Sequence, residues 1–271
     1  MTPAVSVCIP TYNGERFISQ AIESVLAQTF RDFELVVVDD ASTDETLQRV
    51  STFSDPRIRV IRNDRNLGLA GNWNKAVESC TAPIVKLLCH DDLLYPESLR
   101  LQLAAMADPN VALVSARRRV INESGKVIIR SRGAKAGRLP GQQMIRNIVR
   151  SGTNPLGEPS AVLFRRAMHK QVGGFLGDRP YMIDVDFYCR LLELGDSVAL
   201  PEVLCAFRIW GSALSSRLAS SQARQAREFF KDVQARHPEL ITAADLRSGR
   251  LRAAAWASAR RLLYWRVFQK L

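Results

Sequence analysis

The sequence has no apolar run long enough to cross a bilayer, and its N-terminus has no basic stretch followed by an apolar signal core. We therefore expect a cytoplasmic protein. Its five cysteines stand singly within apolar runs, without the spacing of a metal knuckle or a redox pair, which indicates buried thiols. Internal repeats and low-complexity segments are also missing, and the 46% apolar content with mixed charge argues against disorder.

Three common nucleotide-binding motifs are absent as well. No G-x-G-x-x-G follows the first predicted strand, which argues against a dinucleotide-dependent oxidoreductase. The chain has no Walker-type Gly-Lys-Ser/Thr, which argues against a P-loop nucleotidase. The first strand is not followed by the glycine-rich, basic loop that a pyrophosphorylase-type nucleotidyltransferase requires.

Acidic residues are in the minority. Lysine and arginine number 38 against 27 aspartates and glutamates, which gives a net charge of +11 and a pI of about 9.9. The excess lies in residues 117–119, 130–150 and the stretch after Arg217. Such a balance indicates an anionic partner, either nucleic acid, an anionic membrane or a phosphorylated substrate, although a solubilising surface also explains much of it. Because the sequence has no nucleic-acid motif, we expect no nucleic-acid partner.

Apolar runs alternate with helical periodicity along the first hundred residues. We predict strands over residues 5–10, 33–38, 58–61 and 84–89. Helices are predicted over residues 15–27, after the capping segment 41–44, over residues 70–80 and over residues 96–106, and the last of these begins with a proline. This alternation predicts an α/β fold, a mostly parallel, Rossmann-like sheet covered by helices on both faces. In such sheets ligands bind beyond the carboxyl ends of the strands.

The second half of the sequence is less regular. We predict a hairpin of residues 111–120 with 126–130, followed by a mobile basic loop over 132–141 and a short helix over 144–149. A strand over 161–164, a helix over 184–194 and a strand over 203–209 come next. From residue 220 onward the chain is predicted to be helical and basic.

Two adjacent carboxylates follow the strand predicted at residues 84–89. Asp91 and Asp92 repel each other there and lose hydration beside a core strand. A divalent cation removes both costs, and oxygen ligands suit Mg²⁺ or Mn²⁺. Taken alone, the pair is typical of a solvated turn before a helix. Polar clusters also follow the first two strands, however, and we expect all three to meet at one edge of the sheet.

Four segments in the first half carry a resemblance to a known family. They are Val5-Ser-Val-Cys-Ile-Pro-Thr-Tyr-Asn13, Gln28-Thr-Phe-Arg-Asp-Phe-Glu-Leu-Val-Val-Val-Asp-Asp-Ala-Ser-Thr-Asp44, Asn66-Leu-Gly68 with Asn74, and Leu88-Cys-His-Asp-Asp92. In this order they resemble glycosyltransferase family 2, the inverting nucleotide-sugar enzymes of the GT-A fold. The resemblance is close over residues 4–115 and loose over residues 155–216. It implies a catalytic domain over residues 1–216, with a nucleotide-sugar-binding half (1–115) and an acceptor half (116–216), followed by a basic helical extension over residues 217–271.

The resemblance assigns donor-side roles to the polar clusters. Thr11 and Tyr12 resemble residues that line the nucleotide base and ribose, and Asp39 resembles a carboxylate that accepts a hydrogen bond from the base. Uracil and thymine carry a ring N–H donor, so a UDP- or dTDP-linked sugar is implied. The full set of nucleotide-binding residues implied by the resemblance is Pro10, Thr11, Tyr12, Asn13, Asp39, Asn66, Gly68, Asn74 and Asp91.

A metal ion is implied in the same way. Asp91 and Asp92 resemble the acidic pair that holds the ribose and a Mn²⁺ or Mg²⁺ ion on the donor diphosphate, where the ion neutralises charge on the leaving group. The usual Asp-x-Asp-Asp pattern is broken in this chain, because Cys89 stands at its first position.

Acceptor chemistry is implied for the segment from Tyr181 to Leu191. Asp184 matches the general base, which takes the proton from the acceptor hydroxyl as that hydroxyl attacks the anomeric carbon. Asp186 is the alternative base, and Ile183 replaces the Glu that usually precedes the base. Taken alone, the segment is typical of a helix N-terminus rich in acidic residues.

Three further residues are acceptor-side candidates. Trp210 stands where relatives often place a histidine near the diphosphate, and it either stacks on the acceptor sugar or simply packs. Arg208 either contacts the diphosphate or forms a surface salt bridge. Glu158 lies where the family often presents acceptor-side residues.

The segment from residue 252 to 271 alternates basic residues with Trp, Leu and Tyr. This pattern suits a helix lying on an anionic membrane, which would place the protein peripherally on the inner face beside a lipid-linked acceptor. It suits equally well a terminal helix packed on the catalytic domain.

These features together predict an enzyme of surface polysaccharide synthesis. It would transfer a sugar from a nucleoside diphosphate sugar to a glycan or lipid-linked acceptor. The alternative is a catalytically silent sugar-nucleotide-binding protein, which Cys89, Ile183 and Trp210 favour because they depart from the family pattern.

Overall fold

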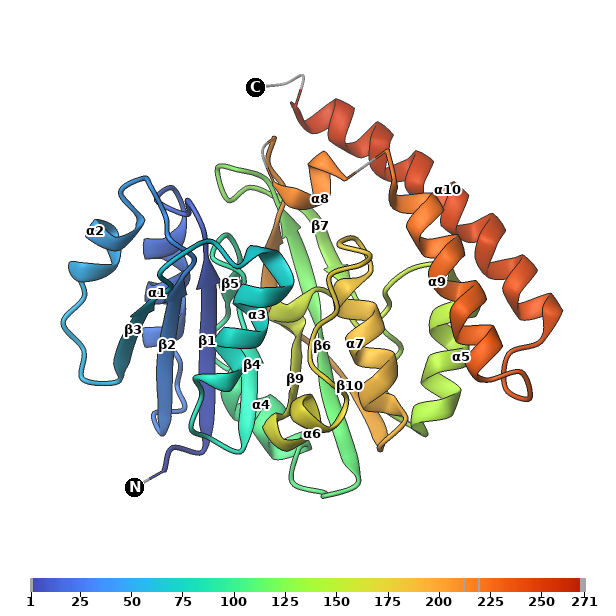
Figure 1. Ribbon diagram of the computed structural model, residues 1–271, viewed down its shortest axis with the longest axis horizontal. Helices are drawn as coiled ribbons and strands as arrows, with labels where there is room; N and C mark the ends of the chain where they lie inside the picture. The colour runs from blue at the N-terminus through green and yellow to red at the C-terminus, as the bar shows by residue number, and fades with distance from the viewer. Residues whose placement is uncertain (1, 212, 219, 269–271) are drawn as a thin grey trace.

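The structure, a computed structural model, describes residues 2–211, 213–218 and 220–268, and these form one sheet of ten strands flanked by helices (Figure 1). The strands follow the order β3-β2-β1-β4-β9-β6-β10-β5, while β7 pairs with β6 and β8 pairs with β10. In chain order they are β1 Val5–Thr11, β2 Phe33–Asp39, β3 Ile58–Arg62, β4 Ile84–Leu87, β5 Leu93–Leu94, β6 Val111–Ile121, β7 Val127–Arg132, β8 Gly137–Leu139, β9 Val162–Arg165 and β10 Asp196–Arg208.

The helices lie on both faces of this sheet. They are α1 Ile18–Leu26, α2 Thr46–Ser51, α3 Gly68–Glu78, α4 Ser98–Ala105, α5 Gly141–Ser151, α6 Arg166–Gln171, α7 Ile183–Leu192, α8 Leu214–Arg217, α9 Gln222–Arg236 and α10 Ala243–Phe268.

Strand pairing divides the sheet into two regions. β1 is parallel to β2 and β4, and β2 is parallel to β3, which confirms the parallel arrangement predicted for the first half. β9 is antiparallel to both β4 and β6, and β10 is parallel to β6. Every residue of β1 is buried, as expected for a central strand covered on both faces. The predicted α/β class is therefore confirmed.

Two apolar cores cover the two faces. Val36 and Val38 of β2 point into the core formed with α3, α5, α7, α9 and α10. Leu35 and Val37 of the same strand point into the core formed with α1, α2 and α4. This alternation follows from the two-residue period of a strand. Figure 1 shows α5, α9 and α10 gathered at the end of the molecule opposite β3.

Three elements of the second half differ from the prediction. β10 begins at Asp196 rather than residue 203, because its first part pairs with β8 as well as β6. β8 itself lies within residues 132–141, which were predicted to form a loop. α5 begins at Gly141 rather than residue 144. A Cβ at Gly141 would lie 1.9 Å from the carbonyl oxygen of Leu192, so only glycine lets α5 begin against the end of α7.

Helix α10 packs on the domain through its inner face. A Cβ at Gly249 would lie 2.1 Å from the carbonyl oxygen of Val149, so the backbones of α10 and α5 touch there. Leu246, Ala253 and Tyr264 on the same face are buried. The packed arrangement considered for the C-terminal segment is thus observed for this face. None of the described helices is both long enough and apolar enough to span a membrane.

Candidate active site

A cavity of about 640 Å³ lies at the carboxyl ends of β1 and β4. The polar clusters that the sequence predicted to meet all contribute to it, with Tyr12 after β1, Asp40 after β2 and Asp91 after β4. Asp184, at the start of α7, lines the same cavity. The predicted site residues found in its lining are Pro10, Thr11, Tyr12, Asn13, Asn66, Gly68, Asp91, Glu158, Asp184 and Trp210.

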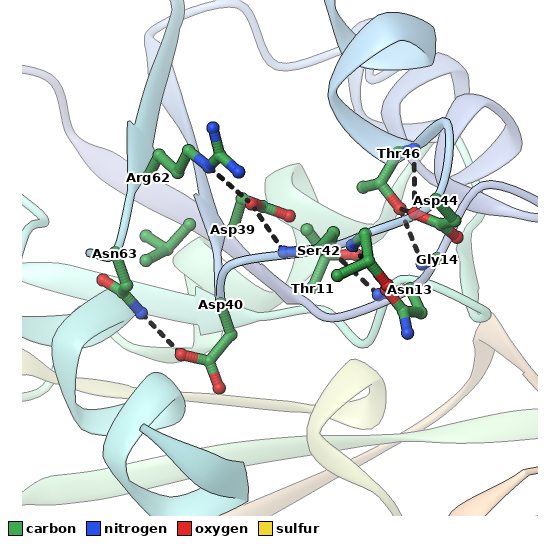
Figure 2. A network of polar contacts seen from close by, with 12 residues as sticks. Thr11, Asn13, Gly14, Asp39, Asp40, Ser42, Asp44, Thr46, Arg62 and Asn63 are labelled. Atoms are coloured by element: carbon green, nitrogen blue, oxygen red, sulfur yellow. Dashed lines mark hydrogen bonds and ion pairs between the residues drawn. The ribbon is translucent and has the colours of Figure 1, made fainter. Parts of the chain in front are cut away.

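Hydrogen bonds join the turns after β1 and β2 (Figure 2). The backbone N–H of Asn13 donates to Oγ of Ser42 at 2.9 Å, and the backbone N–H of Thr43 donates to Oδ1 of Asn13 at 3.0 Å. Asn13 and Ala41 have φ angles of 49° and 58°, in the left-handed region that residues other than glycine rarely adopt. Strain of this kind persists only where surrounding contacts fix it, and it is common at ligand sites.

Gly14 brings the first turn against the loop that follows β4. Its backbone N–H donates to Oγ1 of Thr46 at 2.8 Å (Figure 2). A Cβ at this position would lie 2.5 Å from Oγ1 of Thr11 and 3.0 Å from the ring of His90. A side chain here would therefore push the turn away from the loop that carries Asp91.

Asp40 positions the loop before α3. Its Oδ1 accepts a hydrogen bond from Nδ2 of Asn63 at 2.8 Å (Figure 2). The same oxygen accepts the backbone N–H of Leu67, also at 2.8 Å. Its Oδ2 accepts the backbone N–H of Gly68 at 3.1 Å. Because both oxygens are engaged, Asp40 acts by holding Asn66 and Gly68 at the cavity wall.

Asp39 lies behind this wall rather than in the cavity lining. It is fully buried, and its Oδ2 accepts the backbone N–H of Ser42 at 3.1 Å and lies 3.9 Å from Nε of Arg62. Its Oδ1 is also buried, and no donor within the described residues reaches it. A buried acceptor without a donor is costly, so a ligand N–H that reached this oxygen would be stabilised, but Asp39 itself does not line the cavity.

Asp91 is the carboxylate of the β4 loop that faces the cavity. Its Oδ2 accepts a hydrogen bond from Nε1 of Trp210 at 2.9 Å, and its backbone carbonyl accepts one from Nε of Arg208 at 2.8 Å. Trp210 and Arg208 both contact Phe17, with the indole edge-on at 5.2 Å and the guanidinium 4.5 Å from the ring centroid. Asp91 is therefore held in place from two directions.

Asp92 points into the protein instead. It is fully buried, and its Oδ1 accepts the backbone N–H of Arg208 at 2.9 Å. Burial, and then the negative charge of Asp91, raise the pKa of Asp92 well above its usual range. Of the predicted acidic pair, only Asp91 lines the cavity, and Asp92 supports the loop from behind.

The β4 loop has donor atoms suited to a divalent cation. Ligand atoms of Cys89, Asp91 and Asp92 lie within 4.8 Å of one another. Mg²⁺ and Mn²⁺ usually take one or two carboxylates from the protein and complete their shell with water and substrate phosphates. Asp91 offers such a carboxylate to the cavity, whereas the thiol of Cys89 is a soft ligand that hard cations avoid. The residues present therefore fit a cation held mainly by Asp91.

Asp184 has the environment of a general base. Its Oδ2 accepts a hydrogen bond from Nδ2 of Asn154 at 2.8 Å, and its Oδ1 accepts the backbone N–H of Val185 at 2.8 Å. Burial, and then the negative charge of Glu158, raise the pKa of Asp184 to about 7. A carboxylate with a pKa close to neutral pH is matched to accepting a proton during a reaction.

Glu158 forms an ion pair with Arg118, which is 2% exposed. Gly157, with a φ of 102°, makes this pair possible, because a Cβ there would lie 2.9 Å from Nη1 of Arg118. Both partners of the pair line the cavity. Glu158 therefore reaches the site as predicted, but as one half of a paired charge.

Besides Asp39 and Asp92, three further predicted residues lie outside the cavity lining. Asn74 exchanges two hydrogen bonds with the backbone of Phe175, at 2.9 and 2.7 Å, and so fixes a turn. Asp186 accepts hydrogen bonds from Arg190 at 2.7 and 2.9 Å. Arg208 is buried and donates to carbonyl oxygens of the surrounding loops, so it forms no surface salt bridge. The structure thus gives these three side chains supporting contacts in place of the predicted ligand contacts.

Sequence reasoning missed four arginines of the cavity. Arg118, Arg132, Arg217 and Arg260 all line it. The basic composition of these stretches was evident, but the run of arginines at 117–119 gives no sign of which side chain turns inward. A strand places alternate residues on one face, so Arg118 shares its face with the apolar Ala116 and Val120, whereas Arg117 and Arg119 lie on the other face. That pattern could have singled out Arg118 as the arginine that turns inward.

Comparison with known proteins places the chain in a family. The model of the family described as Glycosyl transferase family 2 matches residues 6–173. An uncharacterised protein of Mycobacterium tuberculosis is 33% identical over 229 residues, which are 81% of this chain and 72% of that protein. The Escherichia coli enzyme WfgD, a UDP-Glc:alpha-D-GlcNAc-diphosphoundecaprenol beta-1,3-glucosyltransferase, is 36% identical over 123 residues, 45% of this chain and about half (49%) of the enzyme.

Solved structures share the fold. Staphylococcus aureus TarS in complex with UDP-GlcNAc superposes with a TM-score of 0.65 at 21% identity, covering 83% of this chain and 65% of that one. The mannosyltransferase PcManGT of Pyrobaculum calidifontis, in complex with GDP-Man and Mn²⁺, also gives a TM-score of 0.65 at 21% identity, covering 96% of this chain and 76% of that one.

Proposed function

Because the chain is a glycosyltransferase of family 2, we propose that it transfers a hexose from a UDP- or dTDP-linked donor to a hydroxyl group of a glycan or lipid-linked acceptor, with inversion at the anomeric carbon. The observation that carries this proposal is the position of Asp184, which shares one cavity with Tyr12 and Asp91. A single displacement with inversion needs one base to take the acceptor proton, and it needs no covalent intermediate.

The donor base would lie at the end of β1. Tyr12 is 47% exposed at the cavity, so its ring is available to stack on a base. Oδ1 of Asp39, which has no donor within the described chain, suits the ring N–H of uracil or thymine. Adenine has no ring N–H donor on this edge, which disfavours an adenine nucleotide. Guanine carries one at N1, and the preference for uracil over guanine is supported instead by the relative WfgD, whose name specifies UDP-Glc.

The donor diphosphate would lie at the β4 loop. Asp91 would hold Mn²⁺ or Mg²⁺ there, and the bound ion would neutralise negative charge on the leaving diphosphate. The indole N–H of Trp210 fixes the orientation of the Asp91 carboxylate, at a position where relatives often carry a histidine. Support also comes from PcManGT, whose structure contains Mn²⁺.

The acceptor would be a lipid-linked sugar of a surface glycan under synthesis. The protein would reach it by binding to an anionic membrane. The name of the relative WfgD specifies a sugar carried on a diphosphate lipid. The exposed face of α10 supports membrane contact, because Leu251, Leu262 and Trp265 are exposed there among arginines.

The variant Asp184→Asn tests the base. The amide keeps the shape of the carboxylate but cannot take a proton, so we expect transfer to fall by about 10²- to 10⁴-fold. Nucleotide binding, measured by titration calorimetry with UDP and Mn²⁺, should stay unchanged. Asp186→Asn is the matched control, because Asp186 pairs with Arg190 outside the cavity and should retain transfer within a few-fold. Equal losses in the two variants would contradict the assignment of Asp184.

A catalytically silent sugar-nucleotide-binding protein is the second candidate. It is favoured by Cys89, which stands at the cavity where the family pattern has an acid. Wild-type protein that binds the nucleotide but shows neither sugar transfer nor donor hydrolysis with Mn²⁺ would establish it.

A further inference from the structure

Four arginines lie in the lining of the cavity, alongside four acidic residues. Its wall includes Arg118, Arg132, Arg217 and Arg260, contributed by β6, β7, α8 and α10, and we call this wall the acceptor side. Among the described residues, Arg118 alone of the four forms an ion pair, with Glu158. The acceptor side is therefore net positive.

Arg132 and Arg260 are held in position by aromatic rings and a polar contact. The guanidinium carbon of Arg132 lies 5.0 Å from the ring of Trp256. The guanidinium carbon of Arg260 lies 5.4 Å from the ring of Tyr181, and its Nε donates to Oε1 of Gln222 at 2.7 Å. A guanidinium that stacks through its face keeps the N–H groups at its edge available for a ligand.

The charges on the acceptor side repel one another. Arg118 and Arg132 are direct partners across the ladder between β6 and β7, an arrangement that destabilises a sheet when the charges are alike. Burial, the charge of Arg118 and the charge of Arg260 all lower the pKa of Arg132, and Glu158 compensates only in part. An anion bound between Arg132 and Arg260 would relieve this repulsion.

An apolar wall adjoins the two arginines. Ile129 and Leu263 line the cavity next to Tyr264, and all three pack in one cluster between β7 and α10. A ligand that bridges the arginines and this cluster must therefore combine a strongly anionic group with an apolar one. Phosphate fits the anionic part, because its oxygens match the fork of guanidinium N–H groups.

We propose that Arg132 and Arg260 bind a phosphate or diphosphate group that links the acceptor sugar to a lipid. This inference rests on the proposed function, since it assumes that Asp184 receives the proton of the acceptor hydroxyl. The donor diphosphate belongs to Asp91 on the β4 loop, so the protein has two separate phosphate sites in one cavity.

Binding of decyl diphosphate tests the proposal. The full-length protein is first saturated with UDP and Mg²⁺, and decyl diphosphate is then titrated below its critical micelle concentration by calorimetry. We expect Arg132→Gln and Arg260→Gln each to weaken this binding by about tenfold or more, because a charge-assisted contact is lost. The matched control is Arg130→Gln, an exposed residue of the same strand that does not line the cavity, and it should bind as the wild type does.

A neutral analogue separates charge from apolar contact. Decyl glucoside offers the same alkyl chain without phosphate, so any binding it shows should be equal in the wild type and both arginine variants. Arg132→Lys keeps the positive charge without the forked guanidinium N–H groups. Its affinity for decyl diphosphate should lie between the affinities of the wild type and of Arg132→Gln. Melting temperatures close to that of the wild type show that each variant is folded.

Failures of the two proposals are distinguishable. If UDP binds but decyl diphosphate binds the wild type and both Gln variants equally, or does not bind at all, the acceptor phosphate site is wrong and the donor site stands. If decyl diphosphate displaces UDP, the arginines belong to the donor site and the inference is overturned. If neither UDP nor dTDP binds the wild type, the proposed function itself is wrong.

Discussion

The pKa of a single carboxyl group sets the pH range in which this enzyme is expected to work. Asp184, the base proposed above, must be ionised to take a proton in that role, and its pKa is raised to about 7 by burial and by Glu158. Transfer should therefore rise as the pH increases through about 7 and level off above it. A carboxyl group whose pKa is raised in the folded state also makes folding less favourable as pH rises from about 4 to 7.

Glu158→Gln should shift this pH dependence. The substitution removes a negative charge close to Asp184 and leaves Arg118 without its partner, and both changes lower the pKa of Asp184. The acid limb of kcat/KM should therefore move to lower pH, which a pH–rate profile between pH 5 and 9 measures. A limb that stays in place or moves to higher pH would show that Glu158 does not act on the base. Thermal unfolding should also show a loss of stability, because Arg118 is buried.

The sequence identified the residue types at the site but not the directions of all their side chains. Residues two apart on a helix point about 200° apart, so Asp184 and Asp186 cannot both face the cavity. Which of them does so depends on how α7 packs against β6 and α5, and a single sequence does not contain that information. The same limit applies to Asp91 and Asp92, which are adjacent in the sequence. The side chain of Asp91 points to the cavity, and that of Asp92 points to the interior.

At the scale of the element, α10 has apolar residues on two opposite faces. The inner face, with Leu246, Ala253 and Tyr264, packs on the domain. The outer face carries an exposed ridge of Leu251, Leu262 and Trp265, which are 75%, 49% and 56% exposed. The ridge is flanked by Arg247, Arg252, Arg261 and Arg266. The sequence left membrane contact and packing as alternatives, and the two faces explain why the pattern suited both.

Removal of this ridge should release the protein from anionic membranes. We expect the wild type to co-sediment with vesicles of phosphatidylglycerol and phosphatidylcholine, and Leu251→Ser, Leu262→Ser and Trp265→Ser combined to weaken binding by about tenfold or more. High salt should also weaken vesicle binding by the wild type, because the flanking arginines contribute an electrostatic attraction to the anionic lipid. The control replaces three exposed apolar residues elsewhere, with Val60→Ser, Val127→Ser and Leu176→Ser.

Two results would contradict a membrane role for α10. One is equal vesicle binding by the ridge variant and the control. The other is a dimer of the wild type that the ridge variant dissociates, since the ridge would then be an interface between copies. The flanking arginines argue against such pairing, because like charges would face one another along both edges of the ridge.

β1 and β4 were predicted well because they are buried on both faces. Their sequences are therefore mostly apolar, interrupted by Ser6 in β1 and Lys86 in β4. β10 was predicted only in part, because exposed and buried residues are mixed along its first half. Its pairing with β8 is a long-range contact that no local pattern encodes.

At the scale of the whole molecule, ligand binding should raise the thermal stability of the folded protein. UDP or dTDP with Mn²⁺ should raise the melting temperature, since a ligand at about 100 times its Kd stabilises the folded state by about 2.7 kcal/mol. ADP should have a smaller effect, because adenine has no ring N–H for Asp39 to accept. Asp91→Asn should abolish the part of the shift that depends on Mn²⁺. A shift that is equal for ADP and UDP, or independent of Mn²⁺ in the wild type, would argue against the donor site described above.

Net charge is a coarse predictor at this scale. A value of +11 indicates an anionic partner without saying where it binds. In the folded protein some basic residues, such as Arg132 and Arg260, line the cavity, and others lie on the outer face of α10. The first location suits a phosphorylated ligand and the second suits a lipid surface. Only the fold separates these two uses of the same composition.

The contact between α10 and the rest of the protein has an evolutionary consequence. The helix is placed mainly by α5 and α9, through the backbone approach at Gly249, and it gives Arg260, Leu263 and Tyr264 to the cavity. Mutations in those three positions leave the strands that carry Tyr12 and Asp91 untouched. If these three residues contact the acceptor as proposed, a lineage could exchange one helix to adopt a new glycan while it inherits its nucleotide chemistry unchanged.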